Sequence, residues 1–519
     1  MRIYRRRAAL SRESLLRVAA IPYTGRNVSQ TSPPSSPQLE RSLTLRGAVT
    51  LNLLDMIGVG PFLTLPLLLG AMGGPQAMLG WVLGALLAAC DGLVWAELGA
   101  AMPEAGGTYH YLAKIFPGRM GRWLSFLFVF QLCISAPLSV ASGCIGLAEY
   151  AGYLSPKLVS HAAVHVLHLG VYRFGVTAGV ATWLAIGTVL LAVALLYRRL
   201  AQVRVLGAVL LTVVLLTLGW AIATGLLRGH IAQVFAFTPG AFRLDHGFFA
   251  GLGSAMLVAT YDYWGYYNVT FLGGETREPG RTIPRAVLIS IVMVAALYLA
   301  LNASVLAVLG APAVIAAGAS MDGRRALIAE LMRVAYAPAL GAHAALLLGK
   351  LAAVMVMVTA FASVFSLLLG YSRIPFAAAR DGNFPAVFGR LHSTRGFPYV
   401  SLLALGGMAC LFCFFSLADV IAALVVLRIV LQFSLQHIGV IVLRLRHPEL
   451  PRPFRLWLYP LPPLLALAGF GYIVVSRPNF HRELLLAAVV ALVGSVFFVV
   501  RSTFARVVLP SSEAPGDVL

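Results

Sequence analysis

The sequence predicts an all-α polytopic membrane protein with twelve transmembrane helices. Its 519 residues are 60% hydrophobic and only 11% charged, which is too apolar for a soluble multidomain protein. The apolar residues form continuous runs that do not alternate with polar residues, so a transmembrane β-barrel is disfavoured. Each run is close to the ~20 residues that a helix needs to cross a bilayer. A membrane protein of this kind also makes nucleic acid a poor explanation for the net charge of +20.

The predicted helices follow an Arg- and Ser-rich N-terminal segment, residues 1–45, which we expect to be a disordered cytoplasmic tail. This segment lacks the apolar core of a secretory signal, although its Arg-rich, acid-poor start is also compatible with an organellar transit peptide. Residues 501–519 are expected to form a cytoplasmic C-terminal tail. The predicted spans are 46–70, 76–101, 121–150, 175–197, 204–227, 247–274, 284–310, 341–372, 397–416, 418–443, 456–475 and 484–500.

The basic residues indicate the orientation. Most of the 39 Lys and Arg residues fall in the N-terminal tail and in alternate connections on the same side. Cytoplasmic loops of membrane proteins carry such an excess of positive charge. The sequence therefore predicts a multi-pass protein of a cell membrane, in contact with lipid, with both termini in the cytoplasm.

Two of the predicted helices are interrupted. Helix 1 contains Gly58, Gly60 and Pro61 near its middle, and helix 6 contains Asp262 followed by Gly265. Interruptions at matching places, five segments apart, indicate two inverted five-helix repeats with a binding site near the membrane midplane. The repeats are predicted at 46–230 and 247–443, and 456–500 adds two C-terminal helices. An aromatic belt at the membrane surface, with Asp262 reaching water, is the alternative interpretation.

The cysteines give no indication of a metal or a disulfide. All five lie in apolar segments, where a thiol usually acts as a small hydrophobic side chain: Cys90, Cys133, Cys144, Cys410 and Cys413. No metal site and no cofactor is expected. The buried residues also offer no nucleophile paired with a base, so the sequence does not predict an enzyme.

Four motifs in fixed order resemble the amino acid–polyamine–organocation transporter superfamily, whose members have the leucine-transporter fold. The motifs are GVGPF (58–62), AELGAAMPEAGGTYHYL (96–112), GGETREPGRTIPRA (273–286) and SRIPFAAARDGNFP (372–385). The first and third are most similar to the plant-type branch that takes up polyamines and amino acids. The resemblance covers helices 1 to 8, and helices 11 and 12 add only their number.

The resemblance implies a substrate site. The helix-1 break at Gly58, Val59 and Gly60 corresponds to the place where backbone N–H groups meet the substrate carboxylate, as a half-helix N-terminus favours an anion. Pro61 departs from the family because it offers no N–H. On helix 6, Tyr261 resembles the aromatic residue that closes over the substrate. The resemblance also implies that the carbonyls of Tyr261, Asp262 and Trp264 lie where the family binds the α-amino group. Gly265, at the break itself, belongs to the same predicted site.

Asp262 is a second departure, since the family usually has a small residue there. Together with Asp55, one turn before the helix-1 break, it favours a cationic substrate and a coupled proton. Asp55 is also compatible with a structural role as a partner for Lys350 or Arg428. Ser363 and Ser366 on helix 8 are candidates for a sodium site or for contacts between helices.

The remaining buried charges are interpreted as gates or structural pairs. Glu97, Glu275 and Arg281 are candidate residues of a cytoplasmic gate. Arg428 and His437 on helix 10 are expected to pair inside the bundle.

The sequence therefore predicts a secondary transporter of amino acids or related amines that works by alternating access. The two acids favour proton coupling, while sodium coupling and transport without a coupled ion stay open, and the expected substrate is a cationic amino acid or a polyamine. A neutral amino acid permease and a non-transporting amino acid sensor are the alternatives. The outer connection 150–174 contains no Cys, so no disulfide-linked heavy chain is expected.

Overall fold

The computed structural model describes residues 39–159, 161–169, 172–416, 425–477 and 479–508. Most of the predicted N-terminal tail and C-terminal tail therefore lie outside the described residues. Packed structure begins slightly before residue 46. Leu43 is buried, its N–H donates to the Glu275 carbonyl at 2.8 Å, and its carbonyl accepts from the Arg277 N–H at 2.9 Å.

The first predicted repeat, 46–230, is built almost entirely of helices. Its first span is broken into two helices that are bent by 47°. The elements are α2 (Leu45–Met56), α3 (Gly60–Met72), η1 (Pro75–Ala77), α4 (Met78–Ala101), α5 (Thr108–Ile115), α6 (Gly118–Leu154), η2 (Pro156–Val159), β1 (His161–Leu169), β2 (Tyr172–Gly179), α7 (Val180–Leu196) and α8 (Leu200–Arg228).

The second predicted repeat, 247–443, also begins with a broken span, and the last two helices follow it. The elements are η3 (Ile231–Phe235), α9 (His246–Tyr263), α10 (Asn268–Phe271), η4 (Gly273–Glu275), α11 (Pro279–Leu309), α12 (Ala311–Gly318), α13 (Met321–Tyr371), α14 (Arg373–Arg380), η5 (Ala386–Gly389), α15 (Tyr399–Phe412), β3 (Phe415–Ser416), the π-helical η6 (Ile429–Ser434), α17 (Leu435–Arg446), α18 (Leu461–Val475) and α19 (Phe480–Val508). The inverted relation between the two repeats stays a prediction.

The number of membrane spans is only partly established. Within the described ranges, seven helices are long and apolar enough to cross a membrane, and the bent pair of α2 and α3 makes an eighth. Three shorter apolar helices, α7, α15 and α18, coincide with further predicted spans. The structure is thus that of a multi-pass helical membrane protein, whereas the count of twelve stays a prediction.

A small antiparallel sheet interrupts the helical architecture, and hydropathy alone did not predict it. The strands β1 and β2 form a hairpin, in which His165 lies opposite Val176, and β3 adds to the edge of β2. The chain between α6 and α7 is therefore extended, and α7 begins at Val180 rather than at the predicted residue 175. Sequential runs of apolar residues do not distinguish such a hairpin from the start of a helix.

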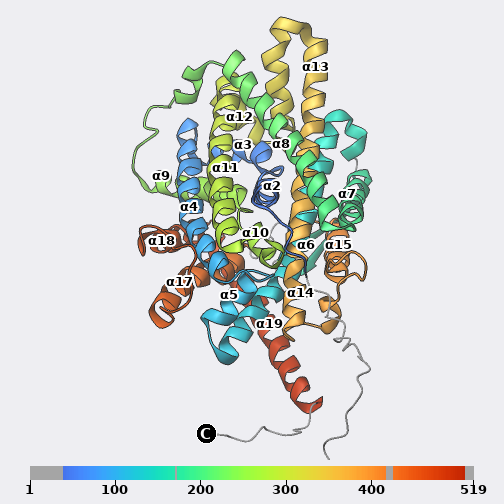
Figure 1. Cartoon of the computed structure of the whole chain (residues 1–519). Helices are drawn as coiled ribbons and strands as arrows, with labels where there is room; N and C mark the ends of the chain where they lie inside the picture. The colour runs from blue at the N-terminus through green and yellow to red at the C-terminus, as the bar shows by residue number, and fades with distance from the viewer. Residues whose placement is uncertain (1–38, 160, 170–171, 417–424, 478, 509–519) are drawn as a thin grey trace, which may run out of the picture. The chain divides into compact units, whose positions relative to one another are not determined.

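The broken helices lie inside the bundle. In Figure 1, α2 and α10 lie between α11 on one side and α6 and α13 on the other, and α2 contacts both α11 and α13. All four residues of α10 are buried, as is the second half of α2. The outer helices expose apolar side chains instead, for example Val209 and Leu216 on α8 and Val496 on α19. Interrupted helices are thus shielded from lipid by continuous ones, as unpaired backbone groups require.

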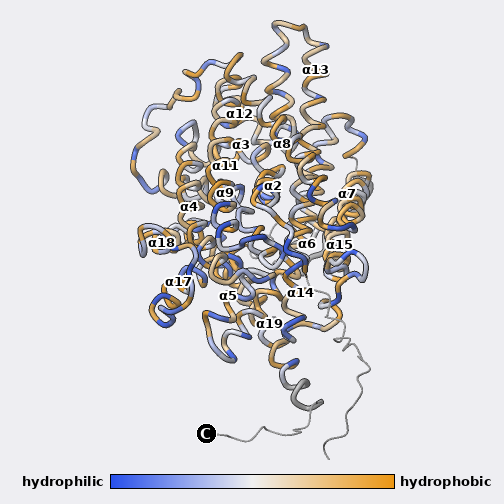
Figure 2. Tube along the Cα trace, in the orientation of Figure 1, coloured by the Kyte–Doolittle hydropathy of each residue, from blue (hydrophilic) through white to orange (hydrophobic). Residues whose placement is uncertain are grey.

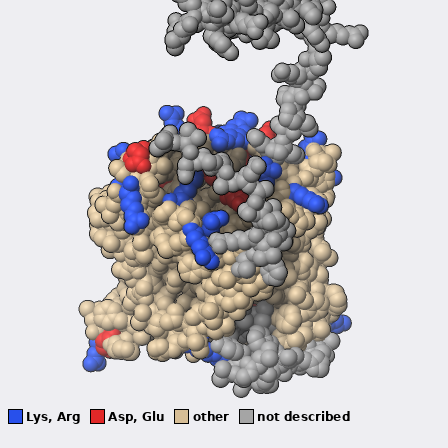
Figure 3. Space-filling model, turned by 90° about the horizontal axis from the view of Figure 1, so that it is seen from below, with Lys and Arg blue, Asp and Glu red and all other residues tan. Residues whose placement is uncertain are grey.

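Charged side chains gather at one end of the bundle. Figure 2 shows hydrophobic helix flanks and more hydrophilic segments around α5, α14 and α17. Figure 3 shows the molecule from that end, where Lys and Arg are visible together with some Asp and Glu. Lys114 on α5, Arg380 on α14 and Arg446 on α17 are exposed. This is the face that the sequence analysis predicts to be cytoplasmic.

Candidate functional site

The two helix breaks meet in the interior. The first break separates α2 from α3 at residues 57–59, and the second separates α9 from α10 at residues 264–267. Gly265 has φ of +123°, and a Cβ at this position would lie only 2.7 Å from the Met56 backbone nitrogen. Only glycine combines that backbone conformation with such a close approach. The residue that interrupts helix 6 is therefore also the residue that allows the two breaks to pack together.

A cavity of about 250 Å³ lies beside the paired breaks. Its size is below the roughly 300–1,000 Å³ typical of drug-sized ligands, so a smaller molecule fits it. Tyr261 is 40% exposed, whereas Asp262 and Trp264 are buried. The predicted substrate-binding residues all line this cavity: Gly58, Val59, Gly60, Tyr261, Asp262, Trp264 and Gly265.

The Asp262 carboxylate lies against the first turn of α3. Its Oδ1 would be 2.2 Å from a Cβ built on Gly60, so only a glycine leaves room for it. Its Oδ2 accepts a hydrogen bond from the Thr64 hydroxyl at 2.5 Å. An acidic residue in a membrane helix costs roughly 2.5–3.5 kcal/mol, and both the hydroxyl and the positive end of the half-helix dipole offset this cost. The place predicted for a substrate carboxylate thus has a carboxylate of the protein next to it.

Asp55 lines the same cavity and is 7% exposed. Its Oδ2 has no hydrogen-bond partner, and among the described residues neither Lys350 nor Arg428 forms an ion pair with it. The predicted structural role as a direct ion-pair partner is therefore not what the structure has. A buried, unpaired carboxylate in a cavity is a typical feature of a functional site.

Arg428 also lines the cavity, and the sequence analysis missed this role. Its guanidinium carbon lies 5.6 Å from the Trp264 ring centre and 5.4 Å from the Tyr371 ring centre, within cation–π range. The guanidinium donates to Gln432 Oε1 at 3.0 Å and to the Tyr371 hydroxyl. An arginine within an apolar segment is the sequence feature that identifies such a residue.

The predicted pairing of Arg428 with His437 is wrong. Nine residues separate them, which is about 13 Å along a helix. His437 Nε2 lies instead 3.1 Å from Asp91 Oδ1 on α4, and Trp95 Nε1 and the Tyr266 hydroxyl contact Asp91 Oδ2. Both partners are fully buried. This pair connects α4 with α17 and with the helix-6 break, outside the cavity.

The two serines of α13 are bonded to the backbone of α2. Ser363 Oγ donates to the Asp55 carbonyl at 3.3 Å, and Ser366 Oγ donates to the Leu51 carbonyl at 2.7 Å. Ser366 Oγ in turn accepts from Asn268 Nδ2 at 2.9 Å. Ser363 lines the cavity, but Ser366 does not. These bonds link α2, α10 and α13 next to the helix-1 break.

Two of the three predicted gate residues form buried ion pairs, with partners that the sequence analysis had not named. Glu275 pairs with Arg373 at 2.8 Å and 3.2 Å, and both side chains are buried. Arg281 is exposed and forms no ion pair within the part of the chain that the structure describes. The ion pair of Glu275 therefore joins η4 to α14.

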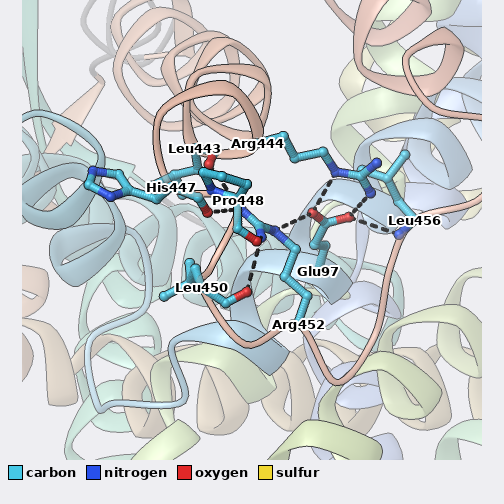
Figure 4. A network of polar contacts seen from close by, with 8 residues as sticks. All are labelled: Glu97, Leu443, Arg444, His447, Pro448, Leu450, Arg452 and Leu456. Carbon is cyan, nitrogen blue, oxygen red and sulfur yellow. Dashed lines mark hydrogen bonds and ion pairs between the residues drawn. The ribbon is translucent and has the colours of Figure 1, made fainter.

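Glu97 is the centre of a larger network (Figure 4). Its carboxylate accepts from Arg444 Nε at 2.9 Å and from the Leu456 N–H at 2.8 Å, and Arg452 Nε lies 3.5 Å away. Arg452 also donates to backbone carbonyls of the loop that joins α17 to α18. A single buried acid thus fixes the end of α4 to α17 and to the following loop.

The cysteines of the described ranges are free thiols, and no group of three His, Cys, Asp or Glu side chains in those ranges could hold a metal ion. The acids, the arginine and the aromatic rings at the cavity are groups that bind a small polar molecule, and none of them forms a nucleophile and base pair.

Comparison with known proteins identifies the family of the chain. The family model for "Amino acid permease" matches residues 43–513. The chain is 25% identical over 450 residues to the serine/threonine exchanger SteT of Bacillus subtilis, covering 84% of this chain and 91% of the relative. It is 24% identical over 448 residues to Asc-type amino acid transporter 1 of Mus musculus, covering 84% and 76%. It is 25% identical over 439 residues to the branched-chain amino acid permease BcaP of Bacillus subtilis, covering 83% and 87%. The chain therefore belongs to the amino acid permease family of the amino acid–polyamine–organocation superfamily.

Proposed function

We propose that this protein is a secondary transporter that moves amino acids or related amines across a cell membrane by alternating access. The observation that carries the proposal is the cavity at the meeting point of the two helix breaks. Half-helices that end at a shared cavity offer unpaired backbone groups to a polar ligand in the middle of the membrane. A binding site between two interrupted helices is also a site whose walls can move.

The access change is proposed to involve the two buried ion-pair sites. Glu275 lies on the chain segment that follows the helix-6 break and pairs with Arg373 on α14, and Glu97 with Arg444 holds the end of α4. If the basic face is cytoplasmic, both sites lie between the cavity and the cytoplasm. Release of these pairs would free the inner halves of the broken helices, which is why we assign them to the inner gate together with the exposed Arg281.

The substrate is proposed to carry an amino group, because two acids line the cavity. With both ionised, Asp55 and Asp262 outweigh the single Arg428, and this excess of negative charge favours a cationic amino acid or a polyamine. A neutral amino acid is the second candidate. It is favoured by the serine/threonine and branched-chain substrates in the names of two relatives.

Coupling to an ion is proposed to use the same region. Asp55 and Asp262 are the candidates for a carried proton, since neither has an ion-pair partner among the described residues. Ser363 and Ser366 are the candidates for sodium, in competition with their hydrogen bonds to α2. Residue-level roles, the cytoplasmic position of both termini and the type of coupling are parts of this proposal.

The test is uptake by purified protein in liposomes, under inward gradients of protons or sodium and with exchange against internal substrate. We expect saturable uptake of at least one amino acid or amine. Asp262→Asn should reduce the preference for cationic over neutral substrates. Absence of uptake and of exchange for every amino acid and polyamine would contradict the transport proposal, whereas saturable binding without flux would favour a sensor.

A further inference from the structure

Arg428 carries a positive charge in the cavity that none of the described carboxylates neutralises by direct contact. The residue is 6% exposed and lines the cavity together with Asp55 and Asp262. No described carboxylate forms an ion pair with it. Arg373, the other buried arginine among the described residues, differs in this respect because it pairs with Glu275. The partly buried Arg444 and Arg452 both contact Glu97. A buried charge without a partner is costly, so proteins rarely keep one without a function.

The hydrogen bonds of Arg428 leave part of its guanidinium free. An arginine has five N–H donors in a planar fork. Nε donates to Gln432 and Nη2 donates to Tyr371, while Nη1 has no acceptor among the described residues. The Trp264 and Tyr371 rings lie near its carbon at 5.6 Å and 5.4 Å. These contacts fix the fork in place, and they leave its outer nitrogen for an oxygen that the protein does not supply.

We propose that Arg428 binds the carboxylate of the substrate, so that the substrate is an amino acid with a free carboxylate and not a polyamine. The inference rests on the proposed transport function and specifies its substrate class. A planar guanidinium held at its other side by an amide and a phenol is suited to a carboxylate, which it can bind through two hydrogen bonds. A polyamine, by contrast, brings only positive charges to a cavity that already contains one.

The position of Asp262 supports this orientation of the ligand. The N-terminus of α3 is the other candidate for binding a carboxylate, but the Asp262 side chain already lies against Gly60 there. Pro61, the second residue of α3, offers no N–H. A substrate carboxylate at that end would be repelled by the carboxylate of Asp262. The substrate carboxylate is therefore directed to Arg428, and its amino group to the side of the cavity that carries Asp55 and Asp262.

A rival explanation is that Arg428 only balances the charge of Asp55 across the cavity. Both explanations predict that loss of Arg428 weakens the binding of an amino acid. They differ for a double variant in which Asp55 is neutral as well. If Arg428 acts only through Asp55, the second change restores binding; if it binds the substrate carboxylate, binding stays weak.

The first experiment uses the unmodified protein and pairs of ligands that differ only in the carboxylate. Binding to detergent-purified protein is measured by thermal stabilisation for arginine against agmatine, lysine against cadaverine, and leucine against 3-methylbutylamine, with the amino acid amides as a third set. We expect at least one amino acid to bind roughly 10–150-fold more tightly than its amine, the range that corresponds to hydrogen bonds to a charged group. Amides should behave like the amines.

The second experiment compares Arg428→Met with Arg333→Met. Arg333 is an exposed arginine that pairs with Glu330 on α13, so its replacement controls for the loss of an arginine. In Arg428→Met, amino acid binding should fall by about 10–150-fold, while binding of the matching amine should become tighter because the repelling charge is gone. Unfolding cannot produce such opposite changes. Arg428→Lys should retain part of the amino acid preference.

The outcomes separate the inference from the proposed function. Equal or tighter binding of amines by the unmodified protein would overturn the role of Arg428 but leave a transporter of amines. The role of Arg428 would also be overturned if Arg428→Met kept its preference for amino acids, or if Arg428→Met/Asp55→Asn bound amino acids as tightly as the unmodified protein. If the unmodified protein bound and transported neither amino acids nor amines, the proposed function would fail and the inference with it.

Discussion

Replacement of Glu97 by Gln should destabilise the protein by leaving two arginines without their shared acid. Glu97 is 1% exposed and is shared by Arg444, Arg452 and the Leu456 N–H. Gln has nearly the same size and keeps one oxygen for the backbone N–H. It loses the charge that both arginines contact, and its amide group directs N–H donors toward one of them. The substitution therefore isolates the electrostatic part of the network in Figure 4.

The expected magnitude follows from the burial of the two arginines. Removal of one partner of a buried ion pair costs about 3–5 kcal/mol. The Arg444 side chain is 19% exposed and can turn toward water, whereas the Arg452 side chain is 6% exposed. We therefore expect about 3 kcal/mol. One kcal/mol corresponds to about 2–4 °C for a domain of 150–250 residues and to less for a longer chain, so the thermal midpoint should fall by about 5 °C.

The assay uses the cysteines of the protein as probes of unfolding. Cys90, Cys144 and Cys413 are buried free thiols, which react with a fluorogenic maleimide only when the surrounding structure opens. Because the unfolding of membrane proteins in detergent is often irreversible, the midpoints should be compared at one scan rate.

The matched control is Glu449→Gln. Glu449 lies in the loop between α17 and α18, which also contains Arg452. It is exposed and pairs with His447 at 3.1 Å, so its loss should change the free energy of unfolding by no more than about 1 kcal/mol. If Glu97→Gln unfolds at the same temperature as Glu449→Gln, the reasoning from burial is refuted. If transport per folded molecule is unchanged in Glu97→Gln although stability falls, the network is structural and Glu97 is not a gate residue.

Two further substitutions test the site and the other ion pair. Gly60→Ala should abolish ligand binding in the thermal-stabilisation assay, because its Cβ would lie 2.2 Å from Asp262 Oδ1. The control is Gly70→Ala on the same half-helix, which has open space around its Cβ and should bind normally. Equal binding by both variants would contradict the steric argument. Glu275→Gln should lower the unfolding midpoint by an amount similar to Glu97→Gln, about 3–5 kcal/mol in stability, because Arg373 stays buried without its partner; a midpoint shift below about 1 °C would show that Arg373 finds another acceptor.

The broken helices were predictable from the sequence because their cause is local. Gly58, Pro61 and Gly265 interrupt apolar runs at residues that cannot sustain a regular helix. Helical hydrogen bonding is a property of neighbouring residues, so the interruption is visible without knowledge of the tertiary structure. The same reasoning placed Asp262 and Tyr261 at the break, and the structure brings them to the cavity.

The extended hairpin and the bounds of the spans were not predictable from hydropathy. The strand β2 ends at Gly179, and α7 begins immediately after it, although the apolar run is continuous across that point. By contrast, α13 consists of two helices joined by a kink at Gly341, whose backbone is non-helical, and this is the residue at which the sequence analysis begins a new span. Hydropathy reports the transfer of a segment to lipid and contains no information on the pairing of its backbone.

The partners of the buried charges were the least predictable part of the site. The sequence analysis names Glu275 and Arg281 together as gate candidates, because both lie in the short connection after helix 6. The structure pairs Glu275 with Arg373, 98 residues away. An ion pair of this kind depends on which helices meet, and sequence distance is informative only for residues one turn apart on one helix.

Helix 10 shows how much this missing information affects the functional interpretation. The sequence places Arg428 and His437 on one helix, and pairing them with each other removes both from consideration as functional residues. In the structure the two residues have different surroundings. His437 contacts Asp91, whereas Arg428 donates to neutral groups and has no carboxylate partner among the described residues. The assignment of one buried pair thus determines the chemistry of the cavity, because the charge that has no partner in the protein is the charge that is available to a ligand. By this reasoning the buried Arg428, which has only neutral contacts among the described residues, is evidence for an anionic group on the substrate, just as the unpaired Asp55 is evidence for a cationic one.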